Sequence, residues 1–272
     1  MRYLFHKLKL LLAVASVTWK EWAAYRTHVM VSIFVGPLFL LAQIFIWRSL
    51  YTGRENLYGL NLDDMIRYFA IVTLLNYFTM DFAGWNLQML INTGRFLTFA
   101  TRPVYHPFFA LSQKFGHRLL GVIFELLPVS LIVRFALGVR LYPPFPLWAA
   151  VSAALGFLMV FLVNYTIGIS AFWMTRTSAL RGAFSLFSGV FSGTFVPLVF
   201  FPEWLQKLLF FLPFQYMTYV PAAVMMGKYR LGGLTASVPE AVGMQALAVA
   251  AMFLVMAALY RLGIRRFTGV GA

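Results

Sequence analysis

The chain has 272 residues, of which 61% are hydrophobic, 18% are aromatic and only 11% are charged, and it contains no cysteine. Its 22 Lys and Arg against 8 Asp and Glu give a net charge of +14, yet so apolar a chain lacks the exposed polar surface that a nucleic-acid-binding protein needs. The composition therefore excludes a soluble protein, a nucleic-acid partner, a disulfide scaffold and thiolate chemistry, and it indicates one integral membrane domain over residues 1–272.

The first 28 residues predict an amphipathic helix that lies in the headgroup layer of the bilayer. Residues 2–22 repeat basic and small side chains at helical spacing on one face, with leucines and tryptophans on the other. This pattern is typical of an interfacial helix. A cleaved signal peptide is the weaker alternative, because charges recur through Lys20 and Arg26 and no small-residue cleavage site follows an apolar run.

Six apolar runs are long enough to cross a bilayer, which takes about 20 predominantly apolar residues. They are residues 29–47, 65–91, 119–139, 147–173, 183–201 and 241–262. Residues 202–240 are also apolar but contain four prolines, which favours short re-entrant or interfacial helices over a seventh span. The expected fold is an all-α membrane protein with six transmembrane helices and short broken outer helices between spans five and six.

Polar side chains inside the spans are the first candidates for function, because ionisable groups are expensive in a membrane. The second span carries polar or small residues at spacings of four, three and four: Tyr77, Asp81, Gly84 and Gln88. In the third span, Glu125 shares a helix face with Arg118, which allows an ion pair. Interhelical hydrogen bonds that fix the packing are the alternative role for Asp81 and Glu125.

The distribution of Lys and Arg predicts the orientation. With the amino terminus in the cytoplasm, the inner segments hold fourteen basic residues and one acid, Glu21, whereas the outer segments hold six basic residues and five acids. Because basic loops stay on the cytoplasmic side, both termini are expected in the cytoplasm, with the chain in the inner (cytoplasmic) cell membrane.

The motifs that would give the chain its own chemistry are missing. It has no GxxxxGK[ST] phosphate loop, no HExxH cluster and no GxSxG elbow, and its four histidines lack metal-ligand spacing. We therefore predict no catalytic residue, no metal site and no bound cofactor. Active transport would draw on an ion gradient or on another subunit.

Two segments carry a more specific signal. The loop after the second span reads NTGRFLTFATRPVYHP over residues 92–107. The end of the fifth span reads PLVFFPEWL over residues 197–205, and Leu212-Pro213-Phe214 follows. Together with the order of the spans, these segments resemble the ABC-2-type permeases, the membrane subunits of ATP-binding-cassette exporters.

The resemblance implies a half-transporter that dimerises with itself or with a related permease. Two separate ATPase subunits would lie underneath and bind ATP and Mg²⁺. The loop would form a coupling helix in an ATPase groove, with the residues Gly94, Arg95, Phe96, Leu97, Phe99, Arg102 and Pro103. An ordinary basic loop on anionic lipid is the alternative.

The resemblance also implies a translocation path between the second and fifth spans. The candidates for this path are Tyr77, Asp81, Gln88, Glu125, Ser188 and Ser192. The candidates for an outer gate are Pro197, Phe201, Pro202, Glu203, Trp204 and Pro213.

The expected function is that of a permease subunit which exports an amphipathic or hydrophobic molecule. A proton-coupled secondary transporter that uses Asp81 and Glu125 is the alternative, although the chain shows no inverted repeat. A membrane-embedded lipid enzyme ranks last, because acid and base groups do not converge at one depth.

Overall fold

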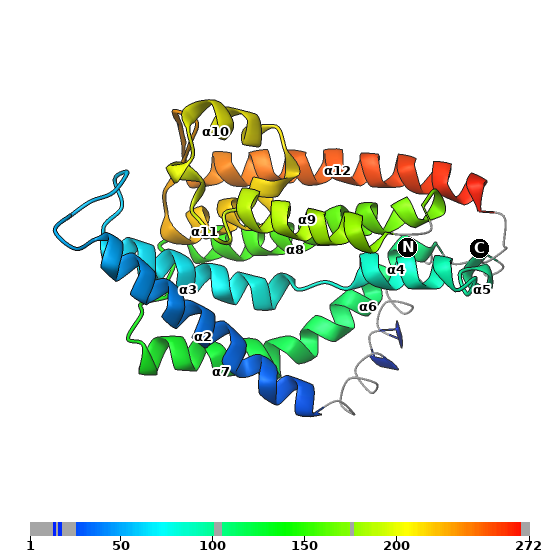
Figure 1. Cartoon of the computed structure of the whole chain (residues 1–272), viewed down its shortest axis with the longest axis horizontal. Helices are drawn as coiled ribbons and strands as arrows, with labels where there is room; N and C mark the ends of the chain where they lie inside the picture. The colour runs from blue at the N-terminus through cyan, green and yellow to red at the C-terminus, as the bar shows by residue number, and fades with distance from the viewer. Residues whose placement is uncertain (1–12, 15, 18–25, 101–104, 175–176, 268–272) are drawn as a thin grey trace.

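The structure is a computed structural model that describes residues 13–14, 16–17, 26–100, 105–174 and 177–267. Almost all of the predicted interfacial helix lies outside the described residues, as do Arg102 and Pro103 of the predicted coupling loop. The described chain is a bundle of helices with one short β-hairpin (Figure 1).

Four helical stretches of the described chain are long and apolar enough to cross a membrane, and they correspond to the first, third, fourth and sixth predicted spans. The first is α2 (Arg26–Leu50), the fourth is α8 (Pro146–Ile169) with the 3₁₀ turn η3 (Ser170–Phe172), and the sixth is α12 (Val238–Arg266). The third comprises α6 (His106–Gly121), the π-helix η1 (Val122–Leu126), α7 (Leu127–Leu131) and the π-helix η2 (Ile132–Ala136). The chain is therefore a multi-pass, mainly helical membrane protein.

The second predicted span, residues 65–91, is two helices rather than one. α3 (Leu62–Thr79) stops and α4 (Ala83–Asn92) starts after a break at residues 80–82. Met80 takes an extended ψ of 134°, and an Asp81 carboxylate oxygen accepts the N–H of Ala83 at 3.2 Å. Such a local side-chain-to-backbone bond competes with helix formation, so the prediction of a continuous helix was wrong here.

The third span begins well before the predicted Leu119. α6 starts at His106 with Pro107 in its first turn, where the missing N–H of proline removes no helical bond. As a consequence Lys114 and Arg118, which the sequence placed in a cytoplasmic loop, are buried inside the bundle.

The fifth predicted span, residues 183–201, is also interrupted. α9 (Ser178–Phe191) ends before a turn in which Gly193 has a φ of +85°, and the 3₁₀ turn η4 (Leu198–Phe200) follows. A positive φ is strained for other residues, so the helix cannot continue through this turn without a cost.

The segment between the fifth and sixth predicted spans contains the expected short helices in a modified form. α10 (Glu203–Phe210) is the first, and the expected second helix is divided into the 3₁₀ turn η5 (Pro213–Tyr216) and α11 (Tyr219–Met226). The hairpin of β1 (Tyr229–Leu231) and β2 (Leu234–Ala236) was not predicted. Its signal was the pair Gly232 and Gly233, whose positive φ angles suit a two-residue hairpin turn.

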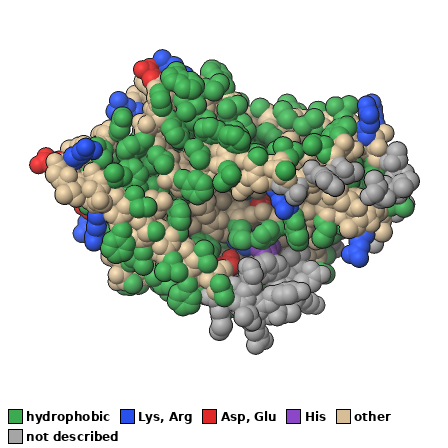
Figure 2. All heavy atoms as spheres, viewed as in Figure 1, with side chains coloured by type: hydrophobic (Ala, Val, Ile, Leu, Met, Phe, Trp, Pro, Cys, Tyr) green, Lys and Arg blue, Asp and Glu red, His purple; other side chains and the backbone are tan. Residues whose placement is uncertain are grey.

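The helices pack around α8, which contacts α12, α4 and α11. Figure 1 shows α4, α5 (Leu97–Ala100) and the end of α12 at one end of the bundle, with α10, the start of α12 and the α2–α3 loop toward the other. Hydrophobic side chains cover much of the middle of the face in Figure 2, whereas most of the visible Lys and Arg lie toward its two ends. This division suits a bundle that crosses an apolar layer.

Candidate functional site

The break in the second span brings a carboxylate into the middle of the bundle. One oxygen of Asp81 caps Ala83, while Oδ2 is buried and has no hydrogen-bond partner among the described residues. Asp81 interacts electrostatically with Lys114 and Arg118 of α6, and its carboxylate lies beside the Asn164 side chain of α8. The break thus positions one acid beside side chains of α6 and α8.

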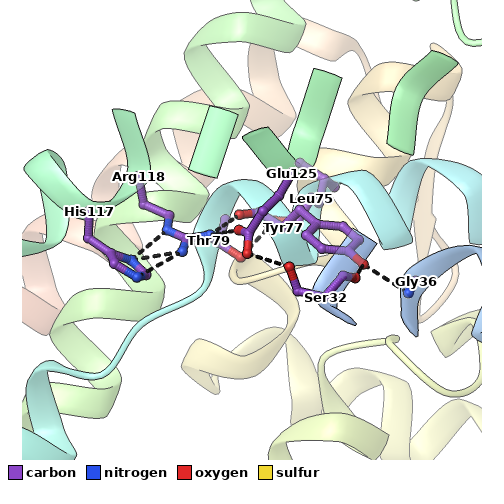
Figure 3. A network of polar contacts seen from close by, with 8 residues as sticks. All are labelled: Ser32, Gly36, Leu75, Tyr77, Thr79, His117, Arg118 and Glu125. Carbon is purple, nitrogen blue, oxygen red and sulfur yellow. Dashed lines mark hydrogen bonds and ion pairs between the residues drawn. The ribbon is translucent and has the colours of Figure 1, made fainter. Parts of the chain in front are cut away.

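A buried ion pair lies next to the break, as the helical spacing of its residues predicted. Arg118 Nη1 lies 3.4 Å from Glu125 Oε2, and both side chains are almost fully buried, with 3% and 2% of their surface exposed. Arg118 also donates to the carbonyl of Tyr77 at 2.6 Å, and Glu125 accepts from the Ser32 hydroxyl at 2.7 Å. The pair therefore joins α2, α3 and α6 (Figure 3).

His117 completes the environment of the Arg118 guanidinium. Arg118 Nε donates to His117 Nδ1 at 3.0 Å. A guanidinium group has no acceptor, so Nδ1 of His117 must carry a lone pair in this arrangement. Arg118 is then bonded to an imidazole, a carbonyl and a carboxylate at once (Figure 3).

Tyr77 connects α3 to α2 rather than lining a continuous polar stripe. Its hydroxyl accepts the N–H of Gly36 at 2.8 Å and donates to the carbonyl of Ser32. Gln88 serves the packing of other helices, because it is buried and its amide donates to the Ile167 carbonyl of the α8 segment at 3.3 Å. Of the four residues in the predicted stripe, Tyr77 and Asp81 line the two cavities that adjoin the break.

Two cavities adjoin the break. A cavity of 490 Å³ lies between α2, α3 and the turn after α9, and Tyr77 belongs to its lining. A cavity of 630 Å³ lies between the end of α3, α8 and α9, and its lining includes Asp81, Ser188 and Ser192. The candidate path residues Ser188, Ser192 and Asp81 are therefore together, whereas Glu125 and Gln88 line neither cavity.

Lys114 was not identified in the sequence analysis. It is the second basic residue, after Arg118, that interacts with Asp81. Its Nζ donates to the Phe157 carbonyl at 2.9 Å and lies 4.1 Å from the centre of the Phe157 ring. Lys114, Arg118 and Glu125 follow at spacings of four and seven, so they share one face of the helix. This spacing could have indicated that Lys114 belongs to the third span. In the sequence analysis, Lys114 was instead assigned to the preceding loop.

The candidate gate residues lie within residues 197–213, and three of them stand where helices begin. Pro197 precedes η4, Pro202 precedes α10 and Pro213 opens η5. Phe201 packs edge-on against the Phe191 ring, and Trp204 is 68% exposed. Prolines at these positions stop one element and start the next.

The other gate residue, Glu203, is on the surface. Its Oε1 lies 2.7 Å from Nζ of Lys207, and this ammonium group lowers the pKa of the exposed Glu203 carboxyl. Gln206, which sequence reasoning did not include, holds the segment together: its amide donates to the carbonyls of Phe201 and Val199, and its oxygen accepts the N–H of Gly232 in the hairpin turn.

The candidate coupling residues divide into a buried set and an exposed set. Phe96 is buried and packs edge-on against His106, Phe172 and Phe267. Arg95 and Leu97 are exposed beside it. Phe96 thus anchors the loop to the bundle. Leu97 is the exposed apolar residue that could contact the expected ATPase subunit.

Two further residues of this loop explain its position. Gly94 has a φ of +70°, which suits glycine at the turn after α4. Phe99 packs edge-on against His106, whose Nδ1 is 2.7 Å from the Tyr165 hydroxyl of α8. The loop therefore contacts the central helix through a short chain of rings.

The comparisons with known proteins agree with these features. No curated protein matches the chain significantly in sequence. The family model described as "ABC-2 family transporter protein" matches residues 38–271, a stretch that includes the loop, the interrupted spans and the outer segment. That match covers well over half of the sequence, and on this basis the chain belongs to the ABC-2 transporter family, as its loop and outer motifs suggested.

Proposed function

We propose that the chain is the permease subunit of an ATP-binding-cassette exporter and that it moves an amphipathic or hydrophobic molecule outward. Separate ATPase subunits would bind and hydrolyse ATP with Mg²⁺, since the chain lacks a phosphate loop. The observation that carries the proposal is the pair of cavities beside the interrupted second span, in a chain of a transporter family.

The proposed topology has six crossings, with both termini in the cytoplasm. α3 and α4 together would form the second crossing. α9 alone is about 21 Å long at 1.5 Å per residue, which is short for a hydrocarbon core of about 30 Å. The turn and η4 that follow would complete the fifth crossing and leave α10, α11 and the hairpin on the outer side.

The proposed coupling surface is the exposed part of the loop after α4. Leu97 would enter an ATPase groove, Arg95 would meet acids at its rim, and Phe96 would transmit the motion to the bundle through its ring contacts. Two copies of the permease, or one copy and a related permease, would sit above two ATPase subunits. This arrangement leaves the path candidates Asp81, Ser188 and Ser192 between the second and fifth spans.

Purification of the tagged chain from its native membrane tests the proposal. We expect an ATP-binding-cassette ATPase to copurify, and we expect vesicles that contain the reconstituted complex to accumulate an uncharged hydrophobic dye such as Nile red only with ATP and Mg²⁺. A matched ATPase variant that lacks its catalytic glutamate should remove this transport. Two results would favour the proton-coupled alternative instead. One is that no ATPase copurifies with the chain, and the other is dye transport that a pH gradient alone drives and that Asp81→Asn abolishes.

A further inference from the structure

The two cavities beside the second span are adjacent. They share four lining residues, which belong to α3, to the break after it and to the turn after α9: Asn76, Met80, Thr194 and Phe195. We propose that the two cavities form one binding site for a single amphipathic molecule with an uncharged, hydrogen-bonding head, whose apolar part lies between α2 and α3. The inference rests on the proposed function in that the bound molecule is the transported one.

The first cavity suits an apolar chain. Its lining is mainly apolar and includes Val31, Val35 and Phe39 of α2 together with Phe195. Val31 and Val35 are more than half exposed, so an apolar chain can enter this cavity from the lipid side without crossing a polar layer. Apolar contact with such a lining provides no preference for a particular polar group, and the head must be selected elsewhere.

The second cavity suits a polar head. Besides Asp81 and Arg181, its lining holds eight hydroxyl and amide side chains. These residues are Asn76, Thr79, Asn164, Ser185, Ser188, Ser192, Thr194 and Thr218. Unpaired polar groups in an apolar medium are costly, so this lining favours an occupant that hydrogen-bonds with it.

Two polar groups of this lining lack partners within the described chain. Oδ2 of Asp81 is buried and accepts no hydrogen bond. Asn76 is exposed on α3 at the junction of the two cavities, and no hydrogen bond to its amide occurs among the described residues. A head that donates to Asp81 and exchanges hydrogen bonds with Asn76 would satisfy both groups.

The surrounding charges select an uncharged head. Asp81 already interacts with Lys114 and Arg118, and Arg118 also pairs with Glu125. Lys114 and Arg118 line neither cavity, so the charges that a head would meet directly are those of Asp81 and Arg181. A cationic head would be attracted by Asp81 but repelled by Arg181. An anionic head would meet Arg181 but would be repelled by Asp81, and such repulsion is strong where water is scarce. Hydroxyl or amide groups avoid both costs.

Photolabelling of the full chain in phosphatidylcholine nanodiscs tests the site without any ATPase. The probe is a decyl maltoside with a diazirine at the end of its alkyl chain, and the labelled residues are identified by mass spectrometry. We expect labelling of residues 31–39 and 73–80 that excess unlabelled decyl maltoside suppresses. Decyltrimethylammonium and decyl sulfate should need about tenfold higher concentrations for the same suppression, which corresponds to about 1.4 kcal/mol.

Two variants and their controls locate the site. Thr194→Trp should obstruct the junction and Val35→Trp should fill the apolar cavity, so each should lower the suppressible labelling about tenfold, or about 1.4 kcal/mol. Leu186→Trp and Phe34→Trp, exposed residues outside both linings, should leave it unchanged. Labelling spread over all lipid-facing helices, equal loss in the controls, or better competition by a charged amphiphile would overturn the inference.

The test separates this site from the exporter proposal. If labelling follows the two cavities but no ATPase copurifies with the chain, the site stands and the exporter proposal fails. If the ATPase complex transports Nile red with ATP while maltoside labelling is not confined to the cavities, only the two-cavity site is wrong.

Discussion

Arg118 and Glu125 form an ion pair two helical turns apart, and nearly all of both side chains is buried. The carboxylate is held from the other side by Ser32 of α2, so the pair joins the first and third spans. Removing one partner of such a pair leaves a charge in a medium that does not solvate it, which costs more than the pair itself contributes.

Glu125→Gln should therefore destabilise the protein strongly, by about 3–5 kcal/mol. Thermal unfolding of the purified protein in detergent micelles measures this as a lower melting temperature. Glu55→Gln, a change of the same kind in the exposed α2–α3 loop, should have little effect.

The double variant Arg118→Gln with Glu125→Gln distinguishes an ion pair from two independent contacts. Because it removes both charges, it should be less destabilised than the sum of the two single variants. Strict additivity would show that the two side chains stabilise the bundle separately.

Gly36→Ala should weaken the contact between α2 and α3. A Cβ at this position would lie 2.3 Å from Cε2 of the Tyr77 ring, whose hydroxyl bonds to the backbone of Gly36. The ring has to move and lose that bond, at a cost of about 1–3 kcal/mol. The readout is again the melting temperature.

Gly243→Ala is the control for this prediction. A Cβ there has nothing within 4 Å, and alanine favours a helix more than glycine does, so α12 should be unchanged or slightly more stable. An equal loss in both variants would point to a general effect of the substitution rather than to the Tyr77 ring.

The loop after α4 offers a test that separates stability from partner binding. Phe96→Ala should leave a cavity among His106, Phe172 and Phe267 and destabilise the chain by about 3–5 kcal/mol. Leu97→Ala removes a side chain that is 49% exposed, so it should lower the melting temperature much less than Phe96→Ala does. Leu97→Ala should instead lower the amount of ATPase that copurifies with the chain.

Tyr142→Ala provides the matched control, since Tyr142 is exposed in the loop between η2 and α8, toward the opposite end of the bundle. It should change neither the melting temperature nor the copurified ATPase. If Leu97→Ala behaves like Tyr142→Ala, the loop is not the coupling surface.

The sequence predicted features that depend on periodicity within one helix. The seven-residue spacing of Arg118 and Glu125 allowed an ion pair, which the structure contains, and the long apolar runs matched α8 and α12 closely. These predictions needed no knowledge of neighbouring helices.

Features that depend on tertiary contacts were not predictable in the same way. The run around Asp81 has the hydropathy of a continuous span, yet α4 approaches α8 so closely that a Cβ on Gly84 would lie 2.2 Å from the Asn164 carbonyl oxygen. That approach and the cap on Ala83 accompany the break. Lys114 was assigned to a loop because charge distribution alone does not show that a lysine can bond to the carbonyl of Phe157.

Cysteine labelling in intact cells tests the proposed orientation, and the absence of native cysteine makes the background clean. Lys207→Cys in α10 should react with an impermeant maleimide added outside, because this side chain is 62% exposed. It is preferable to Gln206→Cys, since Gln206 bonds α10 to the hairpin turn and its loss would loosen the segment. Arg95→Cys, exposed at the opposite end of the bundle, should react only after the membrane is permeabilised. The reverse pattern would place α10 and the hairpin in the cytoplasm and overturn the topology on which the export direction depends.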